Sequence, residues 1–581
     1  MSQKLYEMLK DYAASDFYPW HMPGHKRRLV EFENPFSMDI TEIDGFDDLH
    51  HPEGILKEAM ENAAGIYGSE KSYFLVNGSS CGILAAVSAV VKPGGKLLLA
   101  RNCHKSAYHG ALLQQAKVTY LYPRLEAEGF YGAVQAADVE EALKADPEIE
   151  AVMIVSPGYE GVVSDIKAIS QAAHAHGCAL LVDEAHGAHF PFRNKAIHHN
   201  KAYSSVIHSN KVLSNVIHSN EVLSNVIHSN EALSNEILNN EVLSKEADIK
   251  LQKTLQFPSS ALENGADIVI QSLHKTLPSL TQTAILHVGR NVNQGMGQGS
   301  SSRINVELLE LYLRIYQSSS PSYIFMASID HCIRLMAGEQ GQQLMKIYAE
   351  NLYRTRRELR ENLKVLRLYN PTENDGKVNV QNQAECFYDP SKFVVLGNGS
   401  MDGSKLADTL RSQYHLEPEM NTDHYVILMS SPADTKEGFE RMTKALLEID
   451  RKLAADMKCL NKNLNSAEAS KHHDHLNCSE GSKYEDDAND SVWVNLPTKA
   501  PKTVMKIHQA TTASGQWISL EQALNQTCHD FIYIYPPGIP LLVPGEQIEE
   551  KHLDIIKTYQ AHDLEVHGIQ NGKIRCVKQI D

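Results

Sequence analysis

The chain has 581 residues, of which 42% are hydrophobic, so it can bury a sizeable core in about two to four domains. Its formal net charge of −17 repels phosphate backbones, which argues against a nucleic-acid partner but is compatible with a small cationic substrate. The nine cysteines form no CxxC pairs, which indicates reduced thiols. The sequence has no signal core after Met1 and no apolar run of membrane length, so we expect a cytoplasmic protein without a membrane partner.

Short apolar runs alternate with helical patterns between about residues 70 and 290. The predicted strands are Tyr73–Val76, Lys96–Ala100, Val118–Tyr122, Ala151–Val155, Ala179–Val182 and Asp267–Gln271, and the predicted helices are Gly82–Val91, Asp138–Lys144 and Ile166–His176. Strands separated by helices in this way indicate right-handed crossovers and a largely parallel sheet covered on both faces. We therefore predict an α/β fold, followed by a long helix at Val306–Tyr316, a second α/β segment at about 386–451 and a third globular unit at Val504–Asp581.

A tandem repeat of ten residues, typified by SNVIHSNEVL, interrupts this scheme from Ser204 to Leu243, and a degenerate copy precedes it at Asn194–Tyr203. Ten residues are not a whole number of helical turns, so apolar pairs such as Val216-Ile217 rotate by about 80° from one unit to the next and form no continuous stripe. We interpret the repeat as a surface insertion produced by repeat expansion. A small stacked structure or a partner-binding module is the alternative.

A second interruption, at about Asn461–Asp490, is rich in polar residues and has hardly any core formers. This composition is typical of a flexible linker. His472, His473 and His475 lie within it and could bind a metal adventitiously, but no designed metal site is predicted.

The segment Ser272-Leu273-His274-Lys275 follows directly on the apolar strand Ala266–Gln271. Burial at the end of a strand lowers the pKa of a lysine, and the resulting neutral amine can form a Schiff base with an aldehyde. Ser272 and His274 are placed to donate to a phosphate. The motif is short, and a lysine in such a motif more often lies on the surface without a catalytic role.

The predicted strand Ala179–Val182 runs into Asp183-Glu184-Ala185-His186. Open α/β sheets bind ligands at the carboxyl ends of their strands. A cofactor with a pyridine nitrogen needs a carboxylate there, because the carboxylate keeps that nitrogen protonated and the ring an electron sink. The same letters occur in helicases, but no GxxxxGK[ST] loop is present in the sequence, so we reject a nucleotide site.

Two further turns follow predicted strands. In Asn77-Gly78-Ser79-Ser80-Cys81-Gly82 the glycine permits a turn, and the helix that follows offers free N–H groups and hydroxyls to an anion. In Arg101-Asn102-Cys103-His104 the imidazole could stack on an aromatic ring. The alternative for the first segment is a plain strand-to-helix turn, and the alternative for the second is an ordinary loop histidine. However, all four motifs lie where predicted strands end, which favours a common site.

Long motifs of the chain resemble the ornithine/lysine/arginine decarboxylase family, over nearly the whole sequence outside the two interruptions. They are HMPGHK (His21–Lys26), TEIDGFDDLH (Thr41–His50), FLVNGSS (Phe74–Ser80), RNCHKS (Arg101–Ser106), VDEAHGAHF (Val182–Phe190), GADIVIQSLHKTLPSLTQTA (Gly265–Ala284), SSSPSYIFMASID (Ser318–Asp330) and YPPGIPLLVPGE (Tyr535–Glu546). The resemblance implies a pyridoxal-phosphate enzyme of the aspartate-aminotransferase fold (fold type I), with a mainly parallel large domain, a smaller α/β domain and a C-terminal α+β domain.

The same resemblance implies roles for individual residues. Lys275 would form the Schiff base, Asp183 would bind the pyridine nitrogen and His104 would stack on the ring. Residues Gly78, Ser79, Ser80, Ser272 and His274 would hold the phosphate. His186 would lie near the ring oxygen or the substrate, and either Lys275 or His186 would be the proton donor.

The resemblance also implies a domain organisation and an assembly. The expected boundaries are an N-terminal arm at 1–35, a cofactor-binding domain at 36–330 with the insertion at 194–256, a small domain at 331–457, a linker at 458–500 and a C-terminal domain at 501–581. Because the chain begins close to the PGHK motif, we expect the short form of the family, as a homodimer or homotetramer. Ser318–Ser320 would reach into the partner's active site.

One segment departs from the family pattern. The chain has Val155-Ser156-Pro157-Gly158-Tyr159-Glu160-Gly161 where the family often has Thr-Ser-Pro-Thr-Tyr-Tyr-Gly, which weakens any role inferred for this segment by resemblance. The repeat, too, lies where the family has only a short connection, after the strand that bears Asp183.

The resemblance implies decarboxylation of a basic amino acid, with arginine favoured over lysine and ornithine, as a step that feeds polyamine metabolism. The distal cation of the substrate needs a carboxylate as its partner. The candidates that we favour are Asp44, Asp47 and Glu546, and Glu42 and Asp48 are further candidates. Helix capping and surface solvation are the alternatives for these acids. An aminotransferase with the same cofactor, or an inactive scaffold whose repeat recruits a partner, are the competing functions.

Overall fold

A computed structural model of the chain describes residues 5–28, 34–193, 257–290, 303–371, 388–397, 399, 401–470, 496–499, 501–534, 538–561 and 565–578. The ten-residue repeat lies outside these residues, so the structure does not test whether it binds a partner. His472, His473 and His475 also lie outside them. None of the helices in the described part is long and apolar enough to cross a membrane.

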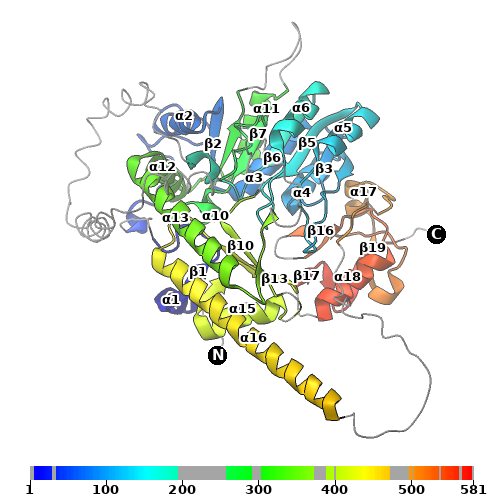
Figure 1. Cartoon of the computed structure of the whole chain (residues 1–581). Coiled ribbons are helices and arrows are strands. Elements are labelled where there is room, and N and C mark those ends of the chain that lie inside the picture. Colours follow the sequence, from blue (N-terminus) through cyan, green and yellow to red (C-terminus); the bar gives the residue numbers. More distant parts are fainter. Residues whose placement is uncertain are drawn as a thin grey trace. The chain divides into compact units, whose positions relative to one another are not determined.

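A seven-stranded sheet holds the N-terminal half together (Figure 1). Its strands, in the spatial order β2-β8-β7-β6-β5-β3-β4, are β2 (Lys71–Leu75), β8 (Ala284–Val288), β7 (Ile268–Gln271), β6 (Ala179–Asp183), β5 (Ile149–Val155), β3 (Lys96–Ala100) and β4 (Lys117–Leu121). Every pairing is parallel except those of β8, which runs antiparallel to both β2 and β7. The predicted α/β fold with a mainly parallel sheet is confirmed, whereas β8 was not predicted.

Helices enclose this sheet. The elements are α2 (Ile55–Tyr67), α3 (Gly78–Val90), α4 (Lys105–Leu113), α5 (Ala136–Ala145), α6 (Ile166–Ala175), α10 (Leu273–Thr276) and α11 (Val306–Tyr316). Helices α3, α4 and α11 contact one another, and α5 packs against α6. Consecutive residues are buried along β6, β7 and β8, so both faces of these strands are covered, as their unbroken apolar runs require.

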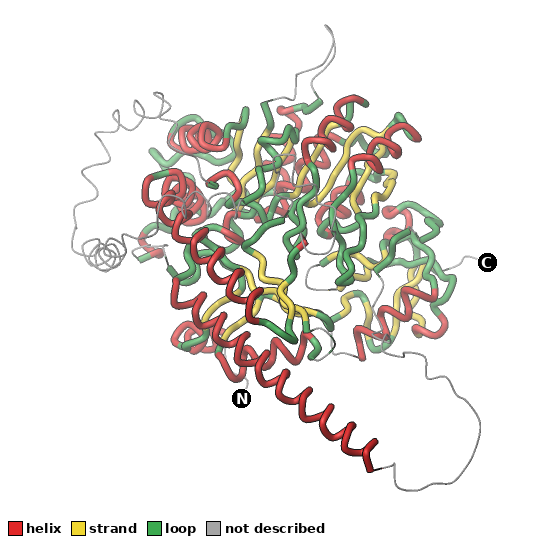
Figure 2. Tube along the Cα trace, in the orientation of Figure 1, coloured by secondary structure: helices red, strands yellow, loops and turns green. Residues whose placement is uncertain are grey.

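A second sheet has four antiparallel strands, in the spatial order β12-β13-β10-β9. Its strands are β9 (Arg367–Leu368), β10 (Lys392–Leu396), β12 (Met420–Asn421) and β13 (Tyr425–Met429), accompanied by helices α12 (Tyr323–Ala337), α13 (Glu339–Asn362), α15 (Gly403–Tyr414) and α16 (Lys436–Ser470). Helix α16 continues to Ser470, so the linker predicted from Asn461 begins too early (Figure 2). The stretch from Asn461 to Ser470 contains neither Pro nor Gly, which permits the helix to continue.

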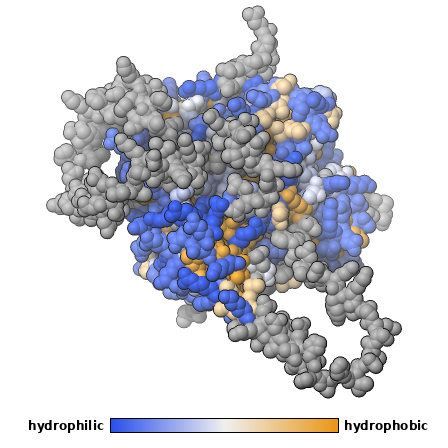
Figure 3. Space-filling view, in the orientation of Figure 1, coloured by the Kyte–Doolittle hydropathy of each residue, from blue (hydrophilic) through white to orange (hydrophobic). Residues whose placement is uncertain are grey.

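The C-terminal part has a core of its own, formed around Ile532, Leu542 and Ile556. Its elements are α17 (Ile507–Thr512), β14 (Gly515–Ser519), η4 (Leu520–Gln522), β15 (Ile532–Ile534), β16 (Ile539–Leu542), α18 (Glu550–Ala561), β17 (Val566–His567), β18 (Ile569–Gln570) and β19 (Lys573–Val577). They form two three-stranded sheets, β14-β19-β18 and β16-β15-β17. The described surface seen in Figure 3 is mainly hydrophilic, as expected from the charge of the chain.

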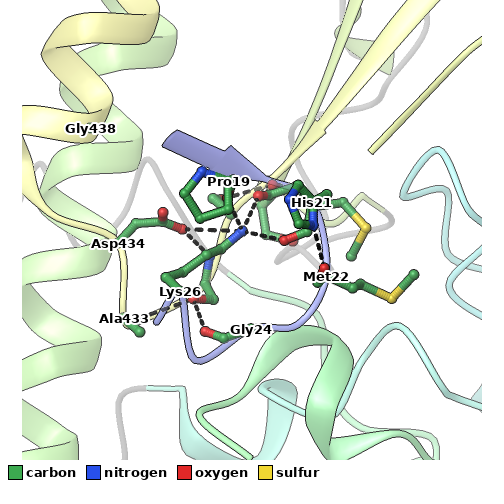
Figure 4. A network of polar contacts seen from close by, with 12 residues as sticks. Pro19, His21, Met22, Gly24, Lys26, Ala433, Asp434 and Gly438 are labelled. Atoms are coloured by element: carbon green, nitrogen blue, oxygen red, sulfur yellow. Dashed lines mark hydrogen bonds and ion pairs between the residues drawn. The ribbon is translucent and has the colours of Figure 1, made fainter. Parts of the chain in front are cut away.

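The N-terminal arm, with α1 (Leu5–Ala14) and β1 (Tyr18–Trp20), joins the four-stranded layer to α10. Strand β1 pairs in parallel with β11 (Leu416–Pro418). The buried ammonium of Lys26 donates to the carbonyls of Pro19, His21 and Met429 at 2.8–2.9 Å and lies 4.0 Å from the carboxylate of Asp434 (Figure 4).

The neighbouring glycine of the same PGHK segment contacts the helix that carries Lys275. The Gly24 amide donates to the His274 carbonyl at 2.6 Å, and a Cβ at Gly24 would come within 2.8 Å of the Leu277 backbone. Only glycine fits this approach. The segment thus fixes α10 against the arm.

We expect Lys26→Met to lower the free energy of unfolding by about 1–3 kcal/mol, because it leaves buried carbonyls and Asp434 without their cationic donor. Thermal or denaturant unfolding of the full chain measures this. Lys436→Met, which changes an exposed lysine at the start of α16, is the control and should change stability by less than about 0.5 kcal/mol. An equal change in both variants would contradict the assigned role of Lys26.

Candidate active site

Lys275 lies on the one-turn helix α10, immediately after the carboxyl end of β7. Its Nζ is 2.9 Å from Nε2 of His186, which follows the end of β6. Both side chains line a cavity of about 580 Å³ at this edge of the sheet. The carboxyl ends of adjacent parallel strands meet at one edge, which is why residues 89 positions apart in the sequence converge here.

The electrostatic surroundings favour an amine at Lys275 that is less basic than an ordinary lysine. Burial lowers the pKa of Lys275, and the carboxylates of Asp183 and Glu419 oppose this effect only in part. A lowered pKa increases the fraction of neutral amine at neutral pH. The neutral amine is the form that attacks an aldehyde carbon.

Asp183 ends β6 as a buried carboxyl group, 3% exposed, whose Oδ1 accepts a hydrogen bond from the Ala185 amide at 3.0 Å. Burial raises the pKa of Asp183 while the charge of Lys275 lowers it. A buried carboxylate favours a cationic partner, because the pair avoids an isolated charge in a medium of low polarity. A protonated pyridine nitrogen meets this requirement.

His186 is buried and neutral, because burial and the charge of Lys275 hold its pKa well below the usual value. Its ring centroid is 4.6 Å from that of Tyr159. Its second nitrogen, Nδ1, has no hydrogen-bond partner among the described residues. A buried polar atom of this kind indicates that the cavity accommodates a polar group.

An anion cradle lies on the same cavity wall, formed by Gly78, Ser79, Ser80 and Ser272. Gly78 has a φ of +75°, and the Asn77 side chain makes no capping bond to α3, so the first N–H groups of that helix are available. The fully buried hydroxyl of Ser272 has no partner within the described part of the chain. Free N–H groups and an orphaned hydroxyl fit a phosphate group.

Two more histidines complete this wall. Burial lowers the pKa of His274 to about 4 and that of His104 to about 3, so both are neutral before a ligand binds. His274 contacts the Thr283 carbonyl through Nδ1, 2.8 Å away, so donation to a phosphate would have to come from Nε2. His104 is the N-cap of α4 and accepts from the Ser106 amide through Nδ1, which leaves its ring on the cavity wall.

The acids selected from the sequence for the substrate cation do not line this cavity as far as the chain is described. Asp47 caps α2, and its carboxylate accepts from the amides of Asp48, Glu53, Gly54 and Leu56. Glu546 is buried and forms a two-pronged ion pair with Arg101, with N–O distances of 2.8 and 2.9 Å. Asp44 is exposed. The sequence did not reveal that Asp47 and Glu546 are already engaged by other groups.

The cavity instead includes acids that the sequence analysis did not select, namely Glu160, Glu419 and Asp423, together with Tyr425 and Tyr559. Glu160 lies in the segment that departs from the family pattern, which was the only sequence signal for it. The other four lie outside every motif used above, so no local pattern identified them.

The loop Ser318–Ser320 lies beside the anion cradle. The Ser318 amide donates to Oδ1 of Asn77 at 3.3 Å, and the Ser318 carbonyl is bonded to Nε2 of His50 at 2.8 Å. All three serines are exposed. Their contribution to a partner's site stays a prediction.

Comparison with known proteins gives matches over most of the sequence. A family model described as Orn/Lys/Arg decarboxylase, major domain, matches residues 3–219 and 196–438, and a model of the C-terminal domain of the same enzymes matches residues 491–572. Arginine decarboxylase of Bacillus subtilis is 26% identical over 99% of this chain and 97% of its own length. Lysine decarboxylase LdcA of Pseudomonas aeruginosa is 21% identical over 99% of this chain and 80% of its own length.

Solved structures show the same fold. Lysine decarboxylase A of Pseudomonas aeruginosa superposes with a TM-score of 0.64 at 16% identity, over 98% of this chain and 81% of that one. Lysine decarboxylase LdcF of Francisella novicida superposes with the same TM-score of 0.64 at 19% identity, over 94% of this chain and 75% of that one.

Proposed function

The chain belongs to the Orn/Lys/Arg decarboxylase family, and from this premise we propose that it converts arginine to the corresponding amine and CO₂. It is a decarboxylase, and pyridoxal phosphate is the cofactor of its family. Several relatives of similar length carry the name arginine decarboxylase, which favours arginine over lysine and ornithine. The product would enter polyamine metabolism.

The observation that carries the proposal is the contact between Lys275 and His186 beside a buried carboxyl group, Asp183, in one cavity. The residues that would hold the cofactor are Gly78, Ser79, Ser80 and Ser272 with His274 at the phosphate, His104 at the ring face, Asp183 at the ring nitrogen and Lys275 at the aldehyde. An inactive scaffold would have no need to retain this set.

When bound, pyridoxal phosphate supplies a sink for the electron pair of the breaking bond between the α-carbon and the carboxylate. Asp183 holds the proton on the ring nitrogen. Lys275 supplies the neutral amine that attaches the cofactor. After CO₂ has left, Lys275 or His186 would return a proton to the α-carbon, having first taken up a proton from the ammonium group of the substrate; both reach the same end of the cavity.

An assembly of at least two chains with shared active sites is part of the proposal. Large apolar side chains are exposed around the TEIDGFDD motif, where Phe36 is 86% and Ile43 50% exposed. Apolar groups gathered in this way on a surface suit a contact with a second copy. The exposed Ser318–Ser320 loop contacts the end of this motif, because the Ser318 carbonyl is bonded to Nε2 of His50.

Release of CO₂ from arginine, lysine and ornithine tests the substrate. The full-length chain is supplied with pyridoxal phosphate and each amino acid in turn, and kcat/KM is measured. We expect arginine to give the highest value. Transfer of an amino group to 2-oxo acids without CO₂ release from any of the three would instead identify an aminotransferase and overturn the proposal.

A further inference from the structure

Three carboxyl groups on the cavity wall are not used by the chemistry described above, namely Glu160, Glu419 and Asp423. Their surroundings distinguish them. The charge of Glu419 raises the pKa of Lys275, so Glu419 acts on the reacting amine. The charges of Glu160 and Asp423 instead raise the pKa values of Tyr425 and Tyr559, beyond the effect of burial. Both acids thus act on the same two tyrosines, and the Tyr425 hydroxyl bonds directly to Glu160.

A tight turn holds Glu160 in place. The Gly161 amide donates to the Gly158 carbonyl at 3.1 Å, and the Gly158 amide donates to the Val162 carbonyl at 2.8 Å. Gly161 has a φ of +100°, and a Cβ there would come within 3.0 Å of the Lys392 side chain. The glycine is needed both for the turn and for the close approach, so the position of Glu160 is set by rigid backbone.

Glu160 is only 8% exposed, and among the side chains of the described residues the Tyr425 hydroxyl is its hydrogen-bond donor, which donates to Oε1 at 2.8 Å. Burial raises the pKa of Glu160, and two neutral donors, the Tyr425 hydroxyl and the Glu160 backbone amide, lower it only in part. A buried carboxylate normally has a cationic partner. Among the described lysines, arginines and histidines, none forms an ion pair with Glu160.

The other two acids already have partners. Glu419 accepts hydrogen bonds from the Met22 amide and from the Tyr159 hydroxyl, one on each oxygen, so it orients the arm and the turn. Asp423 lies 3.1 Å from Nε2 of His424. Glu160 thus keeps capacity for a further strong donor.

A tyrosine hydroxyl belongs to the same cavity wall. Tyr559 on α18 is 9% exposed and lines the cavity, and its hydroxyl makes no hydrogen bond within the described part of the chain. Glu160 lines the same cavity, and its charge is among the causes that raise the pKa of Tyr559. A ligand head that carries several N–H donors would satisfy both the carboxylate and the hydroxyl.

We propose that Glu160 is the specificity-determining residue that binds the distal cation of the substrate, with Tyr559 beside it. The inference rests on the proposed decarboxylation of a basic amino acid. A guanidinium has five N–H donors in a planar fork, so it can contact both side chains at once. The segment that departs from the family pattern would then carry the selectivity of this particular chain.

The test compares arginine with citrulline, in which an uncharged ureido group replaces the guanidinium. The full-length chain loaded with pyridoxal phosphate is used throughout. In Glu160→Gln, kcat/KM for arginine should fall by about 100-fold, since a buried cation loses its counter-charge. The value for citrulline should change by less than about 3-fold, because no charge is involved. The absorbance of the bound cofactor should stay unchanged.

Two variants keep the test decisive. Glu160→Asp retains the charge and should recover part of the preference for arginine over citrulline. Asp423→Asn is the matched control on the same wall, and its effect on arginine should be smaller than that of Glu160→Gln. Equal losses for arginine and citrulline in Glu160→Gln, an unchanged kcat/KM for arginine, or a larger loss in Asp423→Asn would each overturn the inference. A wild-type chain that releases no CO₂ from any basic amino acid would overturn the proposed function instead.

Discussion

Replacing Lys275 by alanine is expected to lower kcat for decarboxylation by at least about 10³-fold, the largest effect of any single change. The amine lies 2.9 Å from His186, and burial lowers its pKa, so it combines the reactive form with the required position. The variant removes both the attachment point of the cofactor and a candidate proton donor. Activity is measured as CO₂ release, and attachment as the absorbance band of the Schiff base.

Lys275→Arg separates charge from reactivity. The guanidinium retains a positive charge beside Asp183 but stays protonated, so it cannot attack an aldehyde at neutral pH. We expect this variant to lose the Schiff-base band as completely as the alanine variant. Lys436→Ala, at an exposed lysine on α16, is the control for nonspecific labelling of surface amines. A band that persists in Lys275→Ala and disappears in another lysine variant would show that the attachment point was misassigned.

The second large effect is expected on stability, at the ion pair between Arg101 and Glu546. Both side chains are at most 2% exposed, and Arg101 also donates to the Leu541 carbonyl at 3.1 Å. Burial alone would lower the pKa of Arg101, but the Glu546 carboxylate reverses this and holds it well above the usual value. Arg101→Met leaves Glu546 buried without a counter-charge, which should lower the free energy of unfolding by about 3–5 kcal/mol.

A double-variant comparison distinguishes the unpaired charge from lost packing. In Arg101→Met with Glu546→Leu both charges are absent, so we expect the double variant to recover most of the loss. Thermal unfolding of the four proteins supplies the comparison. If the double variant is as unstable as the sum of the single ones, packing rather than an uncompensated charge explains the effect. Because β16 lines the active-site cavity, the single variants should also lose activity at temperatures below their unfolding transition.

The local features of this protein were readable from its sequence. The strand Lys96–Ala100 and the helix Val306–Tyr316 have the predicted bounds, because each is an apolar pattern with its own ends, such as the Asn305 side chain that caps the helix. The residues Asp183 and Lys275 could be assigned to one edge of a sheet, since parallel strands that end in polar residues place them together. Family membership followed from the same motifs.

Contacts between distant segments were decided only by the tertiary structure. Glu160 and Tyr425 are 265 positions apart, and Arg101 and Glu546 are 445 apart, so no periodicity or spacing could pair them. Glu546 was predicted to bind substrate because an acidic residue in a motif gives no sign of the arginine that neutralises it. The antiparallel β8 depends on the sheet that receives it, and its pairing is equally absent from local sequence. Local pattern determines elements and strand ends, whereas packing determines which charges are already paired and which are left for a ligand.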